Sequence, residues 1–258
     1  MCGRYALTLP PEALRALFKV LGEDLFPPRY NIAPTQPIHV VATAADRRRE
    51  LVLMRWGFVP SWVKDPAKFP LLINARIESA ADKPAFRNAV RRRRCLVPAT
   101  GFYEWQKRPE GGKQPYLIKP AAPPVVAFAG IHETWIGPDG EEVDTAAILT
   151  RAATPSLAGI HDRMPAVVPE ALFDDWLDPL REDGAAVLAA LPAPADDLFE
   201  RIAISSRINA AANEGPQLQE PVDPQAVAAD TGKAGAGRRA RAERDDAATQ
   251  DRGQLDLF

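Results

Sequence analysis

The chain opens with Met1-Cys2-Gly3-Arg4-Tyr5-Ala6-Leu7-Thr8-Leu9. Side chains alternate over residues 3–9, which predicts a short strand that carries Cys2 into the body of the protein. Initiator methionine is normally removed when the second residue is small, so we expect Cys2 to become the N-terminal residue. The alternative is a cysteine that occupies position 2 by chance in a disordered start.

An N-terminal cysteine carries an amine and a thiol on the same two-carbon frame. Their reference pKa values are about 7.7–8.0 and about 8.5, so both groups are partly nucleophilic near neutral pH. The amine condenses with an aldehyde to an imine, and the sulfur then closes a five-membered thiazolidine ring. No internal cysteine can perform this chemistry.

The composition is that of an ordinary globular protein. The chain has 258 residues, 46% of them hydrophobic and 26% charged, and a formal net charge of −2. Only Cys2 and Cys95 are present, which argues against a disulfide framework and a zinc site and favours a reducing cytosol. No stretch is long and apolar enough for a membrane span, and no secretion signal begins the chain. We therefore expect a cytoplasmic protein.

Hydrophobic periodicity and turn residues predict mixed helices and strands. The expected strands cover residues 38–43, 51–58, 73–78, 95–98, 101–105, 116–119, 125–135, 145–150, 166–168 and 202–206, and the expected helices cover 11–21, 83–94, 169–177 and 184–191. Residues 29–35 read as an ordered loop. From residue 221 the composition turns to Ala, Gly, Asp and Arg, which predicts a disordered linker over 221–253.

Aromatic and basic residues gather in two stretches. Trp56 and Trp62 are flanked by Gly and Pro; they are either packing residues or a stacking platform for bases, with phosphates held by neighbouring cations. The run of arginines over residues 91–94 is either a solvated helix end or part of a phosphate-binding surface.

Three polar positions are candidates for acid–base or positioning chemistry. Asn74 and its neighbours are polar at the end of an otherwise apolar strand. Glu104 lies between aromatic residues, where desolvation would raise its pKa toward the range of a general acid, although an alternating strand could instead turn it to water. His161 is the histidine in a polar loop, while His39 and His132 lie on expected strands.

Several short motifs occur in one order along the chain, and together they resemble the SRAP (SOS-response-associated peptidase) family over roughly residues 2–220. The motifs are Met1-Cys2-Gly3-Arg4-Tyr5, Tyr30-Asn31-Ile32-Ala33-Pro34, Arg55-Trp56-Gly57, Ile73-Asn74-Ala75-Arg76-Ile77-Glu78, Arg94-Cys95-Leu96-Val97-Pro98, Gly101-Phe102-Tyr103-Glu104-Trp105 and His161-Asp162-Arg163-Met164-Pro165.

The resemblance implies an enzyme of the DNA-damage (SOS) response that crosslinks to abasic sites in single-stranded DNA through Cys2. The implied catalytic set is Cys2, Asn74, Glu104 and His161. Asn74 would hold the amine or thiol in attack geometry. His161 or Glu104 would open the sugar ring and dehydrate the carbinolamine, and Glu104 would drive any reversal. The word "peptidase" would refer at most to removal of Met1.

The resemblance also implies how the rest of the molecule serves the site. The implied DNA-binding residues are Arg4, Arg76 and Arg163 at phosphates, with Trp56 or Trp62 holding the strand open. The expected fold is α+β, a single domain with a largely antiparallel, barrel-like sheet and peripheral helices over residues 1–220. No metal and no organic cofactor is implied. We expect a monomer that is cytoplasmic and nucleoid-associated when bound to DNA.

The segment 254–258 resembles the peptide by which bacterial repair proteins bind the replication sliding clamp. Leu257 and Phe258 would be apolar anchors on a solvated tether, with Gln254 and Leu255 adding contacts.

Two other functions compete with DNA crosslinking. N-terminal-nucleophile amidohydrolases, such as glutamine amidotransferases, also begin Met-Cys-Gly, but that function leaves the tryptophan and arginine stretches unexplained. A non-covalent single-stranded DNA-binding module would not need Cys2.

Overall fold

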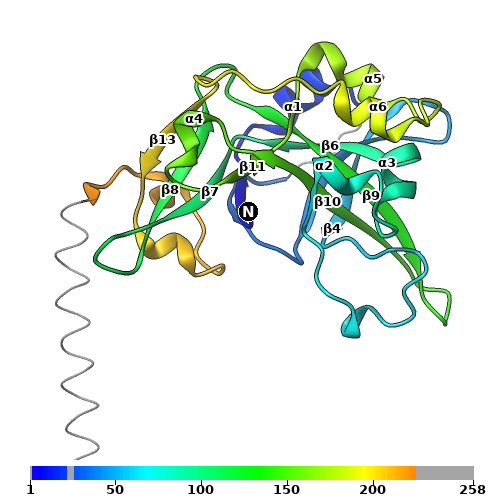
Figure 1. The fold of residues 1–258 in the computed structure, drawn as a ribbon, viewed down its shortest axis with the longest axis horizontal. Coiled ribbons are helices and arrows are strands. Elements are labelled where there is room, and N and C mark those ends of the chain that lie inside the picture. The colour runs from blue at the N-terminus through cyan, green and yellow to red at the C-terminus, as the bar shows by residue number, and fades with distance from the viewer. Residues whose placement is uncertain (1, 22–25, 225–258) are drawn as a thin grey trace, which may run out of the picture.

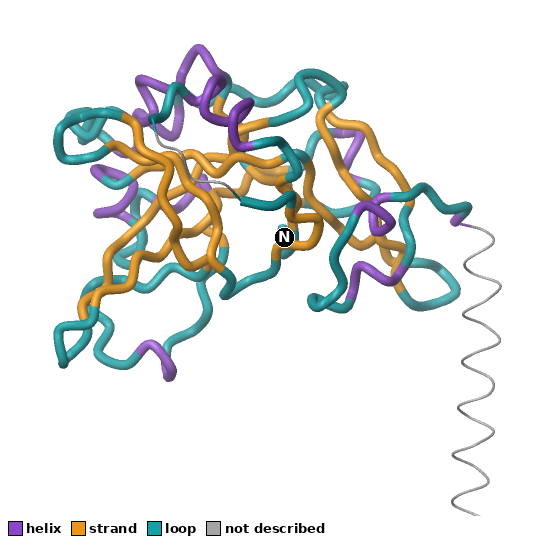
Figure 2. The backbone as a smooth tube through the Cα atoms, turned by 180° about the vertical axis from the view of Figure 1, so that it is seen from behind, coloured by secondary structure: helices purple, strands orange, loops and turns teal. Residues whose placement is uncertain are grey.

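The computed structural model describes residues 2–21 and 26–224, which form two groups of strands that meet at the N-terminus (Figures 1 and 2). The strands are β1 (Tyr5–Leu7), β2 (Arg29–Ile32), β3 (Pro37–Thr43), β4 (Arg49–Trp56), β5 (Asn74–Arg76), β6 (Arg94–Ala99), β7 (Gly101–Lys107), β8 (Lys113–Pro120), β9 (Val126–Ile136), β10 (Glu142–Ala152), β11 (Arg163–Pro165), β12 (Val167–Val168) and β13 (Phe199–Ala203). The α-helices are α1 (Pro11–Phe18), α2 (Ile77–Ala80), α3 (Arg87–Arg92), α4 (Pro155–Ala158), α5 (Phe173–Leu177) and α6 (Gly184–Ala189). Short 3-10 helices are η1 (Pro66–Lys68), η2 (Glu170–Leu172), η3 (Ser206–Asn209) and η4 (Pro216–Gln219).

The first group of strands closes into a barrel in the order β10-β4-β3-β6-β9, because β9 also pairs with β10. The pairs β3·β4, β3·β6, β6·β9 and β9·β10 are antiparallel, while β10 runs parallel to β4 and to β5. Closure leaves no free edge among these strands. The α+β prediction with a largely antiparallel, barrel-like sheet is confirmed.

The second group is an antiparallel sheet in the order β13-β8-β7-β1-β2. In it β1 pairs with β7, with Tyr5 opposite Phe102, and the backbone N–H of Tyr103 donates to Arg4 O at 2.9 Å. The predicted N-terminal strand therefore exists. Its pairing brings the first residues of the chain beside β7.

Aromatic side chains pack where the second sheet meets the barrel. The Tyr5 ring meets Trp56 edge-on at 5.3 Å between centroids and Phe128 at 6.4 Å, and all three residues are buried. The Trp56 indole N–H donates to Ile73 O at 2.9 Å. Trp56 is thus a core residue.

Several predicted boundaries differ from the structure. The first helix ends at Phe18, because Lys19 adopts a left-handed conformation with φ 53°. The strand expected over residues 73–78 is shorter in the structure: it is β5, and helix α2 begins directly after it. The expected loop over 29–35 contains β2, which pairs with β1.

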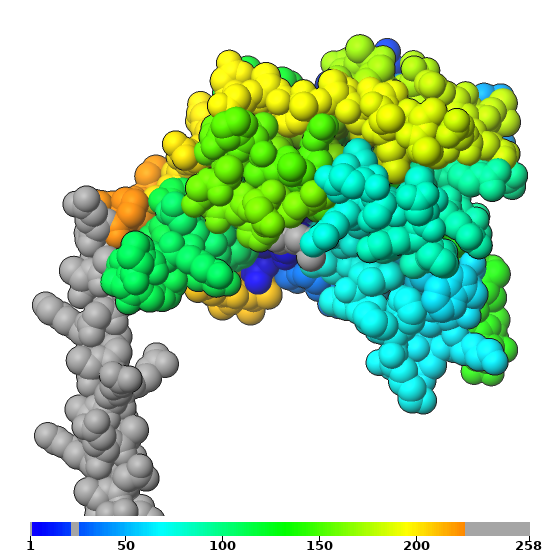
Figure 3. Space-filling view, viewed as in Figure 1, coloured from blue at the N-terminus to red at the C-terminus, as the bar shows by residue number. Residues whose placement is uncertain are grey.

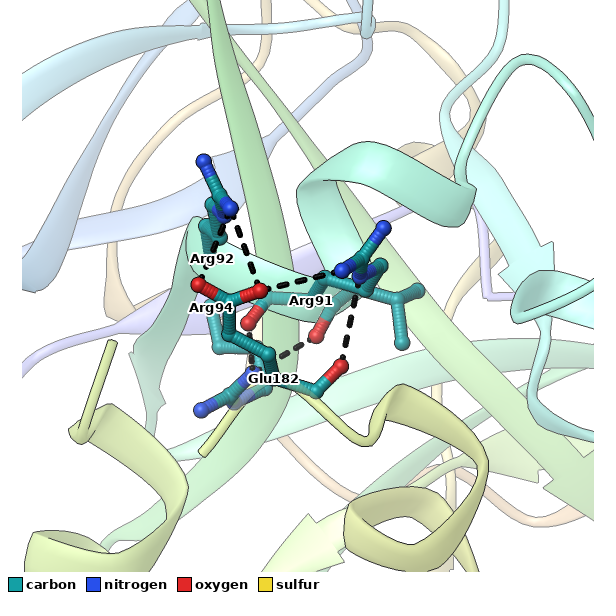
Figure 4. Close-up of polar contacts among 5 residues, drawn as sticks. Arg91, Arg92, Arg94 and Glu182 are labelled. Atoms are coloured by element: carbon teal, nitrogen blue, oxygen red, sulfur yellow. Dashed lines mark hydrogen bonds and ion pairs between the residues drawn. The ribbon is translucent and has the colours of Figure 1, made fainter. Parts of the chain in front are cut away.

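The arginine run divides: Arg91 and Arg92 are exposed at a helix end, as one sequence interpretation expected, whereas Arg94 is buried (Figure 4). Arg91 and Arg92 pair with Glu182 at 3.0 and 2.9 Å at the end of α3. Arg93 pairs with the buried Glu133 at 2.6 Å. Arg94 is buried at the start of β6, and its guanidinium donates to Trp176 O at 2.6 Å and to Val90 O at 2.7 Å. The run joins α3 to neighbouring segments, and its role in binding phosphates stays a prediction.

The described chain extends past the expected domain boundary at residue 220. Pro221 forms a bridge with Ile204, Val222 N donates to Ala203 O at 2.9 Å, and Pro224 O accepts from Arg108. Residues 221–224, expected in the linker, therefore contact the domain. Residues 225–253 of the expected linker and the expected clamp-binding peptide at 254–258 lie outside the described residues and stay predictions. Among the described residues, no helix is long and apolar enough to cross a membrane.

Candidate functional site

The N-terminal segment that carries Cys2 borders a hollow in the molecular surface. Figure 3 shows the blue N-terminal surface between the green surface of the β7–β8 region and the cyan surface of the segment before α2. The Cys2 side chain is buried, and its thiol lies 3.8 Å from Arg4 O. Burial raises the pKa of the Cys2 thiol well above its usual value, and the negative charge of Glu104 adds to the rise. The thiol is therefore protonated at neutral pH.

Asn74 is brought to Cys2 by the parallel pairing of β5 with β10, in which it lies opposite Ile148. Its amide nitrogen donates to Cys2 O at 2.7 Å. Its amide oxygen is buried and has no hydrogen-bond partner among the residues that the structure describes. A buried acceptor left unpaired costs free energy, so this oxygen is suited to accept a hydrogen bond from a bound molecule.

Glu104 lies on β7 and is only 3% exposed. Burial raises the pKa of its carboxyl to about 6. The pairing of β1 with β7 brings this part of β7 beside the first residues of the chain, and the negative charge of Glu104 raises the pKa of the Cys2 thiol. A carboxyl with a pKa near 6 exists in both protonation states around neutral pH, as a general acid–base group must.

His161 lies in the turn that leads into β11 and is half-buried. Its Nδ1 accepts from the backbone N–H of Arg163 at 3.0 Å and lies 2.8 Å from a carboxylate oxygen of Asp162. Burial is the main cause that lowers the pKa of His161, so the neutral ring predominates at neutral pH. In either protonation state Nδ1 has a partner on its own turn, which fixes the orientation of the ring.

The three predicted phosphate-binding arginines differ in what they contact. Arg4 donates to Asn31 Oδ1 at 2.6 Å and to Ile208 O at 2.9 Å. Arg163 forms a two-pronged ion pair with Glu78 at 2.7 and 2.8 Å. Arg76 is exposed at the end of β5. As the structure stands, Arg76 is the one of the three with an exposed side chain.

The two tryptophans predicted to contact DNA differ in their exposure to solvent. Trp56 is 0% exposed, so the prediction that it contacts DNA is wrong. The two tryptophans have similar neighbours in the sequence, but only Trp56 is the last residue of a barrel strand, and its side chain points into the core. Trp62 is 59% exposed on the loop before η1 and meets Phe69 edge-on at 5.6 Å. The prediction for Trp62 remains open.

Sequence reasoning missed Trp105. This residue follows Glu104 on β7, is half-buried, and donates from its indole N–H to Asn209 Oδ1 at 2.7 Å. Its position directly after Glu104 could have indicated where it lies. Successive residues on a strand face opposite sides of the sheet, so Trp105 lies on the side opposite the buried Glu104. It packs with Tyr103 and Ile208 on that other face of the sheet.

Comparison with known proteins shows the family to which the chain belongs. The family model described as "SOS response associated peptidase (SRAP)" matches residues 1–211. The chain belongs to the SRAP family. Among SRAP relatives, "Abasic site processing protein YoqW" of Bacillus subtilis is 35% identical over 224 residues, which cover 85% of this chain and 99% of that protein. "Abasic site processing protein HMCES" of Gallus gallus is 32% identical over 270 residues, covering 86% of this chain and 78% of that protein.

Solved structures agree with the fold of this SRAP chain. A protein from Bacteroides thetaiotaomicron superposes with a TM-score of 0.76 at 21% identity, covering 86% of this chain and all of that one, and this likeness concerns the fold alone. A phage-related protein from Bordetella bronchiseptica gives a TM-score of 0.63 at 28% identity, covering 79% of this chain and 94% of that one.

Proposed function

We propose that this SRAP protein processes abasic sites in single-stranded DNA by forming a covalent crosslink through Cys2 after removal of Met1. One observation carries the proposal: the Asn74 amide donates a hydrogen bond to the Cys2 carbonyl at 2.7 Å, beside the strand that holds the buried Glu104. The names of YoqW and HMCES, both abasic site processing proteins, support the same substrate. The crosslink would shield the lesion during the DNA-damage response.

The reaction needs no external oxidant or reductant. The abasic sugar opens to its aldehyde, the Cys2 amine adds to the carbonyl carbon, and loss of one water leaves an imine. The Cys2 sulfur then bonds to the imine carbon and the thiol proton passes to the nitrogen. The net change is protein plus DNA minus one water, and the closed thiazolidine is a stable covalent product.

Glu104 is the natural proton carrier for these steps. The Cys2 thiol is protonated at neutral pH, so an adjacent carboxylate that accepts its proton favours ring closure. In its protonated form Glu104 can instead assist ring opening and loss of water. His161, held by its own turn, supplies the second polar group of the site. Reversal of the crosslink would use the same groups in the opposite order.

The DNA strand would lie in the hollow around Cys2. Arg76 is exposed and would meet a phosphate, while the exposed Trp62 and the half-buried Trp105 would offer ring surfaces on which bases can stack. Arg4 and Arg163 would reach phosphates only by exchanging the protein acceptors that they now hold.

The test is the mass of the product. The purified protein, incubated with a single-stranded oligonucleotide that carries one abasic site, should give a band of lower mobility on a denaturing gel. Its intact mass should equal the chain without Met1, plus the DNA, minus one water. Loss of Met1 without any such band would reject the proposal, and glutamine hydrolysis would then be measured to test the amidohydrolase alternative.

A variant of Asn74 should slow the reaction without abolishing it. Asn74→Ala removes the 2.7 Å hydrogen bond to Cys2 O, so the reacting amine and thiol lose part of their fixed orientation. We expect the single-turnover crosslinking rate to fall by roughly 10- to 100-fold, with the final yield retained. Ser79→Ala, at a half-buried position on the adjoining helix α2, serves as the control. An unchanged rate in Asn74→Ala would show that Asn74 has no positioning role.

A further inference from the structure

Two lysines face each other across the β7–β8 hairpin. Lys107, the last residue of β7, lies directly opposite Lys113, the first residue of β8. Both side chains are exposed. The turn between them is tight, with Gly111 and Gly112 at φ 97° and 75°, so the two strands stay paired out to the lysines.

This arrangement is unfavourable for the protein alone. Like charges directly opposite on an antiparallel pair repel each other and destabilise the hairpin. In the part of the chain that the structure describes, neither lysine forms an ion pair, whereas Lys119, further along β8, pairs with Glu200 at 3.4 Å. Glu110 lies in the turn itself and is exposed. Two exposed ammonium groups without an ion pair among the described residues are available to a bound anion.

The lysine pair lies close to the candidate site. Lys107 is three residues beyond Glu104 on β7, a separation of roughly 10 Å along the strand. It shares a face of the sheet with Trp105, the face opposite that of Glu104, since residues two apart on a strand point the same way. The charge of Lys113 also reaches His161, where it adds to the effect of burial in lowering the pKa of that ring. Figure 1 shows the hairpin reaching out on one side of the N-terminus.

We propose that Lys107 and Lys113 form a phosphate-binding clamp for the single strand as it leaves the Cys2 site over the β7–β8 hairpin. The inference rests on the proposed function and adds to it the side of the hollow on which the strand lies. Trp105 would stack a base, and the two ammonium groups beyond it would hold phosphates one or two nucleotides from the lesion. The phosphate charge would remove the repulsion between the lysines.

The test compares non-covalent binding of an undamaged single-stranded oligonucleotide by wild type and by Lys107→Gln/Lys113→Gln. Each lost phosphate contact lowers the slope of log affinity against log salt by about 0.7 on single strands. The double variant should therefore show a slope smaller by about 1.4, so that raising salt from 50 to 200 mM costs the wild type about sevenfold more affinity than it costs the variant.

A matched control removes two charges elsewhere. Lys19→Gln/Lys119→Gln changes the net charge equally, with Lys19 at the end of α1 and Lys119 six residues, roughly 20 Å, along β8 from Lys113. Its salt slope should equal that of the wild type. Lys107→Glu provides a second readout: it replaces repulsion with attraction across the hairpin, so Tm should rise by about 1–2 °C while DNA affinity falls.

The outcomes separate this inference from the proposed function. A wild type that crosslinks while the lysine variant keeps its full salt slope overturns the clamp and leaves the crosslinking reaction standing. A wild type that binds single strands with the lysine-dependent slope but forms no covalent product supports the clamp and rejects the crosslink. A control variant that loses as much slope as the lysine variant also overturns the clamp.

Discussion

The variant Cys2→Ala is expected to give no durable crosslink with abasic single-stranded DNA. Alanine keeps the N-terminal amine after removal of Met1, so the imine still forms, but without sulfur it cannot close to a thiazolidine and hydrolyses back. Borohydride reduces an imine to a stable amine. The alanine variant should therefore give a covalent product with borohydride and none without it, while the wild type gives product in both conditions.

Cys95 supplies the matched control for this experiment, because it is the only other cysteine of the chain. It is buried in β6, and Cys95→Ala should keep full crosslinking with a small loss of stability. A durable product in Cys2→Ala without borohydride, or its loss in Cys95→Ala, would contradict the assignment of the nucleophile.

The second large effect is expected from Glu104→Gln, which keeps the shape of the side chain and removes its ability to exchange a proton. General acid–base catalysis contributes typically 10²- to 10⁴-fold, so the single-turnover rate should fall by roughly that factor. The pKa of Glu104 is about 6. If the protonated carboxyl acts in the slow step, the wild-type rate falls as the pH rises through about 6, and this limb is absent in the variant.

His161→Ala completes the pH experiment. A falling limb that persists in both Glu104→Gln and His161→Ala would falsify the assignment of proton transfer to this pair. Glu110→Gln, an exposed carboxylate on the same hairpin, is the control and should leave the profile unchanged.

Glu104→Gln should also change stability, and in the direction opposite to activity. The folded-state pKa of Glu104 is raised to about 6 from a reference value of 4.5, so the folded protein binds the proton more tightly than the unfolded chain. Wild-type stability therefore declines as the pH rises from about 4.5 through about 6, by a total of about 2 kcal/mol. Glutamine has no charge to bury. The variant should gain stability over the wild type at pH 7, and the difference should shrink at pH 4.

Some features of the site could be predicted because they depend on residue type and local order. The alternation of residues 3–9 predicted a strand, and β1 pairs with β7 as a strand should. Aromatic neighbours on both sides of Glu104 suggested desolvation, and its carboxyl is buried with a raised pKa. The ordered motifs indicated the SRAP family, which the family match over residues 1–211 confirms.

Other features depended on contacts between distant segments. Trp56 and Trp62 have similar sequence surroundings, yet one fills the core and the other is exposed, because a barrel strand ends between them. Arg91 and Arg92 meet an acid about ninety residues away, and Arg94 is buried against the backbone of α5. A charge run in a sequence carries no information on which partners the fold brings to it.

Residue types and their order establish the chemistry that this protein has available: an aminothiol after loss of one methionine, a carboxyl among aromatic residues, an asparagine and a histidine in separate motifs. Which of these groups come together is a property of the folded chain. Asn74 reaches Cys2 because β5 runs parallel to β10, and Glu104 does because β7 pairs with β1. The physical reason is that side-chain periodicity is a local property, which repeats every two residues along a strand. Strand pairing instead joins segments some 70 to 100 residues apart, through backbone hydrogen bonds that all residue types except proline can form.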